Sequence, residues 1–209
     1  MKKFSALFQP GNIGKMRLKN RLIMAPLGTI LLDSEGGVTD NLLDYYRPRA
    51  AGGVGLVIAQ CSSPNVEAKA LYSLGIYDDK FVPGLKQLFQ VIHQGGAKVA
   101  VQLMHPGLLI VAGGLVAPGV PVKVPSVTSW MTGDLPYTEV SEDDIDGYTE
   151  DYAEAARRAK EAGADAVELH ACHGCLIGGF MSPLMNLRTD RYGGQRGEPH
   201  GDPQSYRRP

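Results

Sequence analysis

The chain has 209 residues, of which 44% are hydrophobic and 21% are charged, a composition typical of a folded globular protein. Its 21 basic and 22 acidic residues give a formal net charge of -1, so there is no excess of positive charge for binding nucleic acid. No apolar run reaches the roughly 20 residues of a membrane-spanning helix, and the N-terminus lacks the apolar core of a signal peptide. These features predict a cytoplasmic protein that binds neither nucleic acid nor membranes.

The usage of cysteine, glycine and proline gives further information about the kind of protein. Three cysteines in a reducing compartment indicate free thiols rather than a disulfide framework. The 26 glycines and 14 prolines exceed the typical usage of about 7% and 5%. We therefore expect many tight connections, with backbone left accessible to a ligand.

Five segments of the chain have the pattern of short strands or a hairpin. Residues 13–20 resemble a small hairpin, which we expect to plug one end of the fold. Four apolar runs follow, at residues 22–25, 56–59, 99–103 and 166–169. Because these runs are apolar throughout and do not alternate, they predict parallel strands that are covered on both faces.

Helical patterns lie between the predicted strands. Thr39 is expected to cap the first helix, in which Pro48 predicts a kink or an early end. The second helix has an apolar period and stops at residues 95–96, two glycines. The third helix has a capping-box pattern in Ser141 and Asp144 and acidic residues in its first turn.

The alternation of strands and helices predicts a parallel α/β fold. The strands begin near residues 22, 55, 98 and 166, and the first spacing is close to the roughly 31 residues per unit of an eight-unit barrel. We therefore predict the first half, about four βα units, of a TIM (β/α)8 barrel with a short N-terminal hairpin. A doubly wound open sheet has the same alternation, but no Gly-x-Gly-x-x-Gly follows any strand.

Candidate site residues follow the carboxyl ends of all four strands. They lie in residues 25–29, 60–65, 102–107 and 170–175, which contain small, amide and imidazole groups. A Gly-, Pro- and Val-rich insertion at residues 106–140 begins at the same edge. Because barrel enzymes place their chemistry at this edge, we expect these groups to converge on a planar ligand.

Several motifs are similar to the Old Yellow Enzyme family. They are the run from Leu18 to Pro26, Gln102-Leu-x-His, His170-Ala-Cys-His-Gly, Phe180-Met-Ser-Pro, and Asn186-x-Arg-Thr-Asp-Arg-Tyr-Gly-Gly. The resemblance covers about residues 7–194. It implies an FMN-dependent NAD(P)H:flavin oxidoreductase, as in ene-reductases and 2,4-dienoyl-CoA reductases. Such an enzyme transfers hydride from NAD(P)H through FMN to the activated C=C bond of a small alkene or enoyl-type substrate.

The resemblance also implies roles for individual residues. Those matching the cofactor site are Ala25, Pro26, Leu27, Gly28, Cys61 and Gln102. In the family, the amide at the position of Gln102 reads the pyrimidine edge of the flavin, since one amide offers both a donor and an acceptor. His170 and His173 match the pair that holds the carbonyl oxygen of the alkene and stabilises enolate charge. Taken singly, each of these residues also has an ordinary structural interpretation.

Two positions depart from the family pattern. Cys175 stands where a tyrosine commonly delivers a proton to the substrate carbon. A thiol with a pKa of about 8.5 can donate a proton, but the reach of a phenol is lost, so another group or water remains an alternative. Leu108 replaces an arginine of the family.

A metal site is an alternative interpretation of the fourth strand end. His170, Cys172, His173 and Cys175 combine two imidazoles with a Cys-x-x-Cys pair, which suits zinc or an iron–sulfur cluster. No second ligand pair lies elsewhere in the sequence, so we expect no metal here. A c-type haem is excluded because Leu176 stands where Cys-x-x-Cys-His needs histidine.

The last residues depart from the family. Residues 195–209 contain no aliphatic side chain and three prolines, so they cannot form the apolar helix with which the family continues. Codons for residues 195–200 can be chosen so that a shift of one base encodes Ser-Val-Glu-Asn-Arg-Met, the family's continuation. We therefore expect residues 1–194 to be the N-terminal part of an FMN-binding barrel and the tail to result from a frameshift, which resequencing tests.

This expectation has consequences for activity and assembly. The intact product would be longer, and an iron–sulfur cluster would be held only by the missing C-terminal region. Half a barrel has open strand edges, so self-association is expected. The alternative function is a non-catalytic, truncated half-barrel that binds no flavin.

Overall fold

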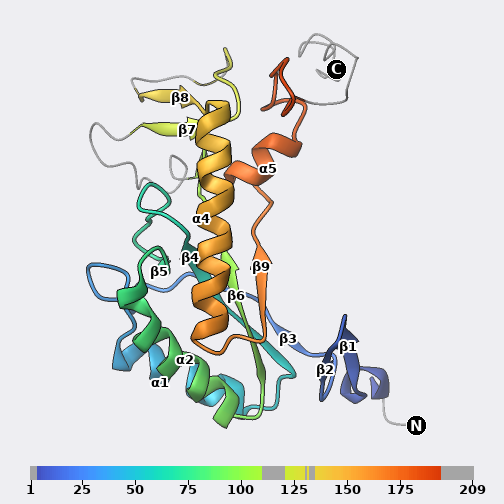
Figure 1. Cartoon of the computed structure of the whole chain (residues 1–209). Helices are drawn as coiled ribbons and strands as arrows, with labels where there is room; N and C mark the ends of the chain where they lie inside the picture. The colour runs from blue at the N-terminus through green and yellow to red at the C-terminus, as the bar shows by residue number, and fades with distance from the viewer. Residues whose placement is uncertain (1–3, 110–120, 130, 132–134, 194–209) are drawn as a thin grey trace. The chain divides into compact units, whose positions relative to one another are not determined.

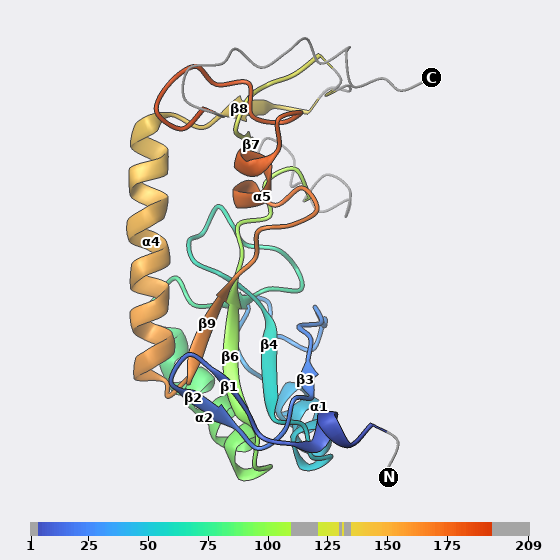
Figure 2. The same ribbon diagram turned by 90° about the vertical axis from the view of Figure 1, so that its right-hand side faces the viewer.

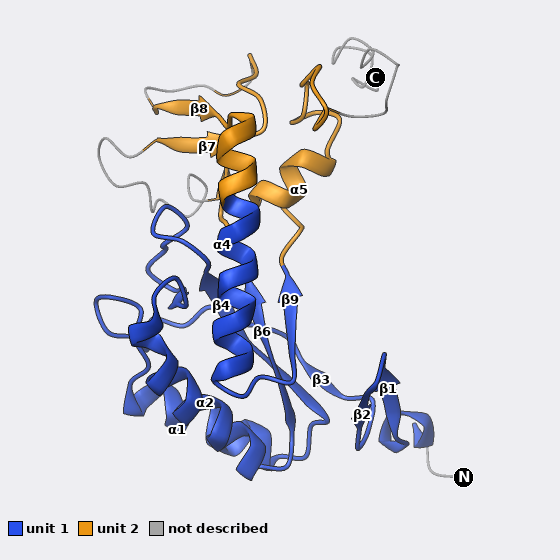
Figure 3. Ribbon diagram, viewed as in Figure 1, with its two compact units in different colours: residues 1–104, 148–169 blue, residues 105–147, 170–209 orange. Residues whose placement is uncertain are grey.

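The computed structural model describes residues 4–109, 121–129, 131 and 135–193. The chain divides into two compact units (Figure 3): unit 1 comprises residues 1–104 and 148–169, and unit 2 comprises residues 105–147 and 170–209. The proposed aberrant tail at 195–209 lies outside the described residues, as does much of the insertion predicted at 106–140.

Short strands, four α-helices and two 3₁₀ helices make up the described chain (Figure 1). In chain order the elements are η1 (Ser5–Phe8), β1 (Gly11–Ile13), β2 (Met16–Leu18), β3 (Ile23–Met24), α1 (Asp40–Ala51), β4 (Leu56–Ser63), β5 (Leu74–Gly75), η2 (Asp79–Phe81), α2 (Val82–Gln94), β6 (Lys98–Leu103), β7 (Val122–Val124), β8 (Tyr137–Glu139), α4 (Glu142–Glu161), β9 (Ala166–Leu169) and α5 (Leu176–Met181). The boundary between the units falls within α4.

The core of unit 1 is a parallel sheet in the order β3-β4-β6-β9 (Figure 2). The short strand β5 pairs with the end of β4. All four predicted strands are therefore confirmed, and their carboxyl ends meet at one edge. This order, in which each strand lies beside the next long strand of the chain, is that of consecutive βα units in a barrel.

One face of this sheet is covered by helices. Val57, Val99 and Val101 pack in one apolar cluster with residues of α1 and α2, and with Ala155 and Ala159 of α4. The expectation that every strand is covered on both faces is wrong for the outer strands. Ile23 in β3 is 46% exposed, and in β9 Val167 and Leu169 are 40% and 55% exposed. None of the three belongs to the apolar clusters that the helices and the hairpin form with the sheet among the described residues.

The predicted hairpin is confirmed and covers the other face. β1 and β2 pair antiparallel around a turn in which Gly14 has a φ of +55°. Leu18 of β2 is 2% exposed and packs with Leu56 of β4 and Ala100 of β6. Leu56 and Ala100 alternate along their strands with the residues that pack under the helices, so they point to the opposite face of the sheet. The hairpin therefore lies against the face that is the inner face of the sheet in a barrel.

Helix signals in the sequence are largely confirmed. The Thr39 hydroxyl accepts a hydrogen bond from Leu42 N–H at 3.3 Å and caps α1. The helix does not end at Pro48, however, but continues to Ala51. Buried Tyr46 and Ala50 anchor it to the core on both sides of the proline, so tertiary packing offsets the lost hydrogen bond.

The capping box of α4 is also present. Asp144 N–H donates to Ser141 Oγ at 3.0 Å, and Ser141 N–H donates to Asp144 Oδ2 at 2.9 Å. These reciprocal bonds, with Lys123 Nζ 3.2 Å from the same carboxylate, hold the pKa of Asp144 below its ordinary value. In the described part of the chain, no helix is both long and apolar enough to cross a membrane.

Candidate functional site

A β-bulge in unit 1 brings Cys61 and Gln102 to the same face of the sheet. The register between β4 and β6 pairs Ala59 with Val101 and then Cys61 with Gln102, leaving Gln60 as an extra residue. Without this bulge, Cys61 would follow Val57 and Ala59 onto the face under the helices. The bulge therefore turns its thiol to the inner face, beside the predicted amide.

Gln102 is partnered by an acidic residue of the next strand. Its Nε2 donates to Glu168 Oε1 at 3.0 Å, and the two residues are opposite each other in β6 and β9. The other carboxylate oxygen, Glu168 Oε2, is buried with no hydrogen-bond partner among the described residues. Because the Gln102 carboxamide keeps its oxygen and a second N–H, this face offers both acceptors and a donor to the edge of a polar ring.

The segment after β3 lies at the same edge of the sheet. Ala25, Leu27 and Gly28 are exposed and Pro26 is half-buried, so their backbone is accessible to a ligand. A Cβ at Gly28 would lie 2.8 Å from a ring carbon of Tyr72. Glycine is therefore required at this position by its contact with Tyr72, a reason that the resemblance did not supply.

Gln60 positions this segment, a role that its place in the candidate run 60–65 did not predict. Its side chain is fully buried, and its Oε1 accepts bonds from Thr29 N at 3.2 Å and Thr29 Oγ1 at 2.7 Å. Its Nε2 donates to the Tyr72 carbonyl at 3.1 Å, and its backbone N–H donates to the Tyr46 hydroxyl at 2.9 Å. A polar residue within an apolar strand was the signal that could have revealed it.

Replacing Gln60 by alanine should lower the free energy of unfolding by about 1–3 kcal/mol, because its partly buried partners on Thr29 and Tyr72 lose their hydrogen bonds. Denaturant titration of the purified chain measures this loss. Gln90→Ala, on the exposed side of α2, is the matched control and should change stability by no more than about 0.5 kcal/mol. Equal effects of the two variants would contradict the positioning role.

The two histidines of unit 2 lie close together around a thiol. The rings of His170 and His173 are 5.0 Å apart between centroids and nearly perpendicular. Cys172 Sγ lies 3.6 Å from His170 Nδ1 and Nε2 and 3.7 Å from His173 Nδ1. His173 has a φ of +27° and Gly174 a φ of +89°, so a tight left-handed turn directs these side chains to one another.

Cys175 is separated from this cluster. Its side chain is fully buried, and burial raises the pKa of its thiol to about 12. Its backbone N–H bonds to the Cys172 carbonyl at 2.9 Å and closes the turn. A proton donor must reach its substrate within hydrogen-bond distance, so the burial of Cys175 argues against this role.

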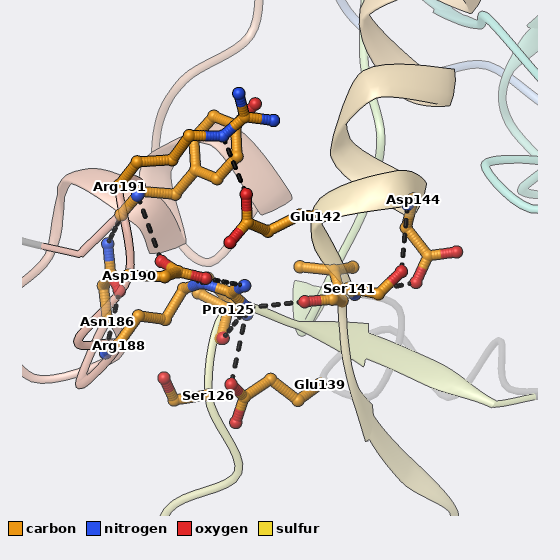
Figure 4. Close-up of polar contacts among 12 residues, drawn as sticks. Pro125, Ser126, Glu139, Ser141, Glu142, Asp144, Asn186, Arg188, Asp190 and Arg191 are labelled. Atoms are coloured by element: carbon orange, nitrogen blue, oxygen red, sulfur yellow. Dashed lines mark hydrogen bonds and ion pairs between the residues drawn. The ribbon is translucent and has the colours of Figure 1, made fainter.

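The motif at residues 186–190 forms a network in unit 2 (Figure 4). Arg188, whose side chain is 5% exposed, donates to both oxygens of Asp190 and to the carbonyls of Pro125 and Val140. Asn186 donates to the carbonyls of Phe180 and Tyr192 at 2.9 and 2.8 Å. The ion pair raises the pKa of Arg188 and lowers that of Asp190, so this motif holds the loops of the unit together.

Comparisons with known proteins bear on the whole chain. The sequence model of the "NADH:flavin oxidoreductase / NADH oxidase family" matches residues 6–198. A "Metal reductase" of Desulforamulus reducens is 40% identical over 91% of this chain and 28% of its own length. An "NADPH dehydrogenase" of Listeria welshimeri is 37% identical over 92% of this chain and 56% of its own length.

A solved structure supports the fold. The old yellow enzyme homologue from Zymomonas mobilis is 31% identical, with a TM-score of 0.77 over 91% of this chain and 55% of its own. The likeness confirms the prediction of a partial (β/α)8 barrel. The chain thus spans about half of that structure, and between 28% and 56% of the two relatives above.

Proposed function

Because this chain belongs to the NADH:flavin oxidoreductase / NADH oxidase family, we propose that it supplies the N-terminal, flavin-binding part of an FMN-dependent enzyme. The reaction we propose is hydride transfer from NAD(P)H to the activated C=C bond of a small alkene or enoyl-type substrate. The observation that carries the proposal is the bulge at Gln60, which sets Cys61 beside Gln102 on the inner face of the sheet.

The residues on this face fit the edge of a flavin ring. The Gln102 carboxamide oxygen would accept from the ring N–H, and its free N–H would donate to a ring carbonyl. Glu168 holds the amide by the 3.0 Å bond from Gln102 Nε2, which fixes the side chain before any ligand arrives. Ala25, Pro26, Leu27 and Gly28 would contact the ring through their backbone, and Cys61 through its small side chain. When bound, FMN supplies the hydride.

We assign the substrate carbonyl to the two imidazoles of unit 2. His170 and His173 would each donate a hydrogen bond to one oxygen atom, since their ring centroids are only 5.0 Å apart. These bonds polarise the alkene and stabilise negative charge as it develops on the oxygen, an effect worth about 10²–10³ in rate per donor. We assign the proton that completes the reduction to water rather than to Cys175, because this thiol is fully buried.

Flavin binding tests the proposal. The purified chain is titrated with FMN and followed by flavin fluorescence, and saturable binding is expected. Gln102→Ala should weaken it about thirtyfold, since two hydrogen bonds of about 1 kcal/mol each are lost. Gln90→Ala is the control and should bind like the parent. A chain that binds no FMN would favour the non-catalytic half-barrel, and unchanged affinity of Gln102→Ala would remove this residue from the site.

The open edge of the sheet supports a proposal about assembly. Among the described residues, β9 pairs with β6 alone, and its Val167 and Leu169 are 40% and 55% exposed. Unpaired edges with apolar side chains favour association with another chain, so we propose that two copies associate through β9. Sedimentation of the chain should show a dimer, and Val167→Lys should shift it to monomer. A parent chain that is already monomeric would contradict this proposal.

A further inference from the structure

Glu168 places an acidic group on the face of the sheet to which we assign the flavin. It lies opposite Gln102 in the pairing of β9 with β6, and Gln102 Nε2 donates to its Oε1 at 3.0 Å. We infer, on the basis of the function proposed above, that the negative charge of Glu168 lowers the reduction potential of bound FMN. Glu168 then does more than hold the amide, because it makes the reduced cofactor a stronger hydride donor.

The charge of Glu168 is weakly compensated. Its Oε1 is bonded to the neutral amide of Gln102, and its Oε2 is buried with no hydrogen-bond partner in the part of the chain that the structure describes. Ala166, two residues earlier on the same face of β9, packs against the apolar cluster of Leu18 and Leu56. Because apolar surroundings screen a charge less than water does, the carboxylate acts strongly on charges near it.

Reduction of FMN adds negative charge to the part of the ring that Gln102 is proposed to contact. A hydride from NAD(P)H carries two electrons and one proton to the flavin, so the ring gains one negative charge and the nicotinamide leaves as NAD(P)⁺. This charge is delocalised over the pyrimidine part of the ring, where nearby protein charges tune the cofactor. A carboxylate one hydrogen bond behind the amide repels it. Reduced FMN is therefore bound less tightly relative to oxidised FMN, and hydride transfer to the alkene becomes more favourable.

One substitution separates the charge of Glu168 from its hydrogen bond. Because a carboxylate only accepts, Glu168 also orients Gln102 with its N–H group toward β9 and its oxygen free for a ligand. In Glu168→Gln the new carboxamide oxygen can still accept from Gln102 Nε2, whereas the negative charge is lost. A residue that only orients the amide would leave the potential of FMN unchanged in this variant.

Reductive titration of the chain saturated with FMN tests the inference. Parent and Glu168→Gln are reduced with dithionite in the presence of a dye of known potential, and the affinity for oxidised FMN is measured by flavin fluorescence. We expect Glu168→Gln to bind reduced FMN about tenfold more tightly relative to oxidised FMN, which raises the two-electron potential by about 30 mV. Its affinity for oxidised FMN should stay close to that of the parent.

Two further variants serve as controls. Glu168→Asp keeps the charge, and Glu150→Gln removes an equal charge from an exposed position of α4, so both should keep the potential of the parent. Equal potentials in parent and Glu168→Gln, with FMN bound by both, would overturn this inference and leave the proposed flavin site standing. An equal rise in Glu150→Gln would also overturn it, since net charge alone would then set the potential. A parent chain that binds no FMN would overturn the proposed function, and this inference with it.

Discussion

Replacing Arg188 by alanine is expected to lower the free energy of unfolding by about 3 kcal/mol. Its side chain is 5% exposed, and its guanidinium bonds at once to Asp190 and to the carbonyls of Pro125 and Val140. Removing one partner of a buried ion pair costs about 3–5 kcal/mol, and the 26% exposure of the Asp190 side chain places the loss at the lower end. Denaturant titration measures it, and Arg188→Lys should recover little, because an ammonium group cannot reproduce the planar fork.

Arg191 provides the matched control three residues along the chain. It pairs with two carboxylates, Glu142 at 2.8 Å and Asp146 at 3.1 Å, but its side chain is 58% exposed. Exposed ion pairs contribute about 0–1 kcal/mol, so Arg191→Ala should lower stability by no more than that. Similar losses for Arg188→Ala and Arg191→Ala would show that the network at Arg188 contributes through surface charge and not through burial.

This contrast shows what could and could not be predicted from the sequence at residues 186–190. The motif could be assigned to a family, but the residue types in it do not indicate which arginine is buried. Arg188 and Arg191 carry the same charge, and they differ because Arg188 points to carbonyls of distant segments, near residues 125 and 140. Contacts of such sequence separation depend on the tertiary fold, which residue types alone do not specify.

Strands and helices were predicted better than the faces of the sheet. Apolar runs identified the four strands because burial selects such runs whatever their neighbours are. The side to which Cys61 points depends on the bulge at Gln60, and a bulge is defined by pairing with β6. The exposure of Leu169 likewise depends on which elements cover β9. The family resemblance supplied the candidate residues, and the register explains how Cys61 and Gln102 come to share a face.

Stability should fall on acidification because of His105. This side chain is 3% exposed, and burial, with the positive charge of Lys123 as a smaller cause, lowers its pKa from 6.5 to about 4. The unfolded chain therefore binds a proton between pH 6.5 and about 4 that the folded chain does not bind. The stability linked to this group is complete above pH 6.5 and is lost as the pH falls toward 4.

The size of the effect follows from the shift. A difference of about 2.5 pKa units corresponds to about 3 kcal/mol in total, of which about 2 kcal/mol should be lost between pH 7 and pH 5. Denaturant titrations across this range measure the loss.

His105→Asn removes the titrating group and keeps an acceptor for the Gly107 N–H, which bonds to His105 Nδ1 at 3.2 Å. Carboxylates titrate mainly below this range, so the free energy of unfolding of His105→Asn should fall about 2 kcal/mol less than that of the parent between pH 7 and 5. An equal slope in parent and variant would mean that His105 is not the group that destabilises the protein in acid.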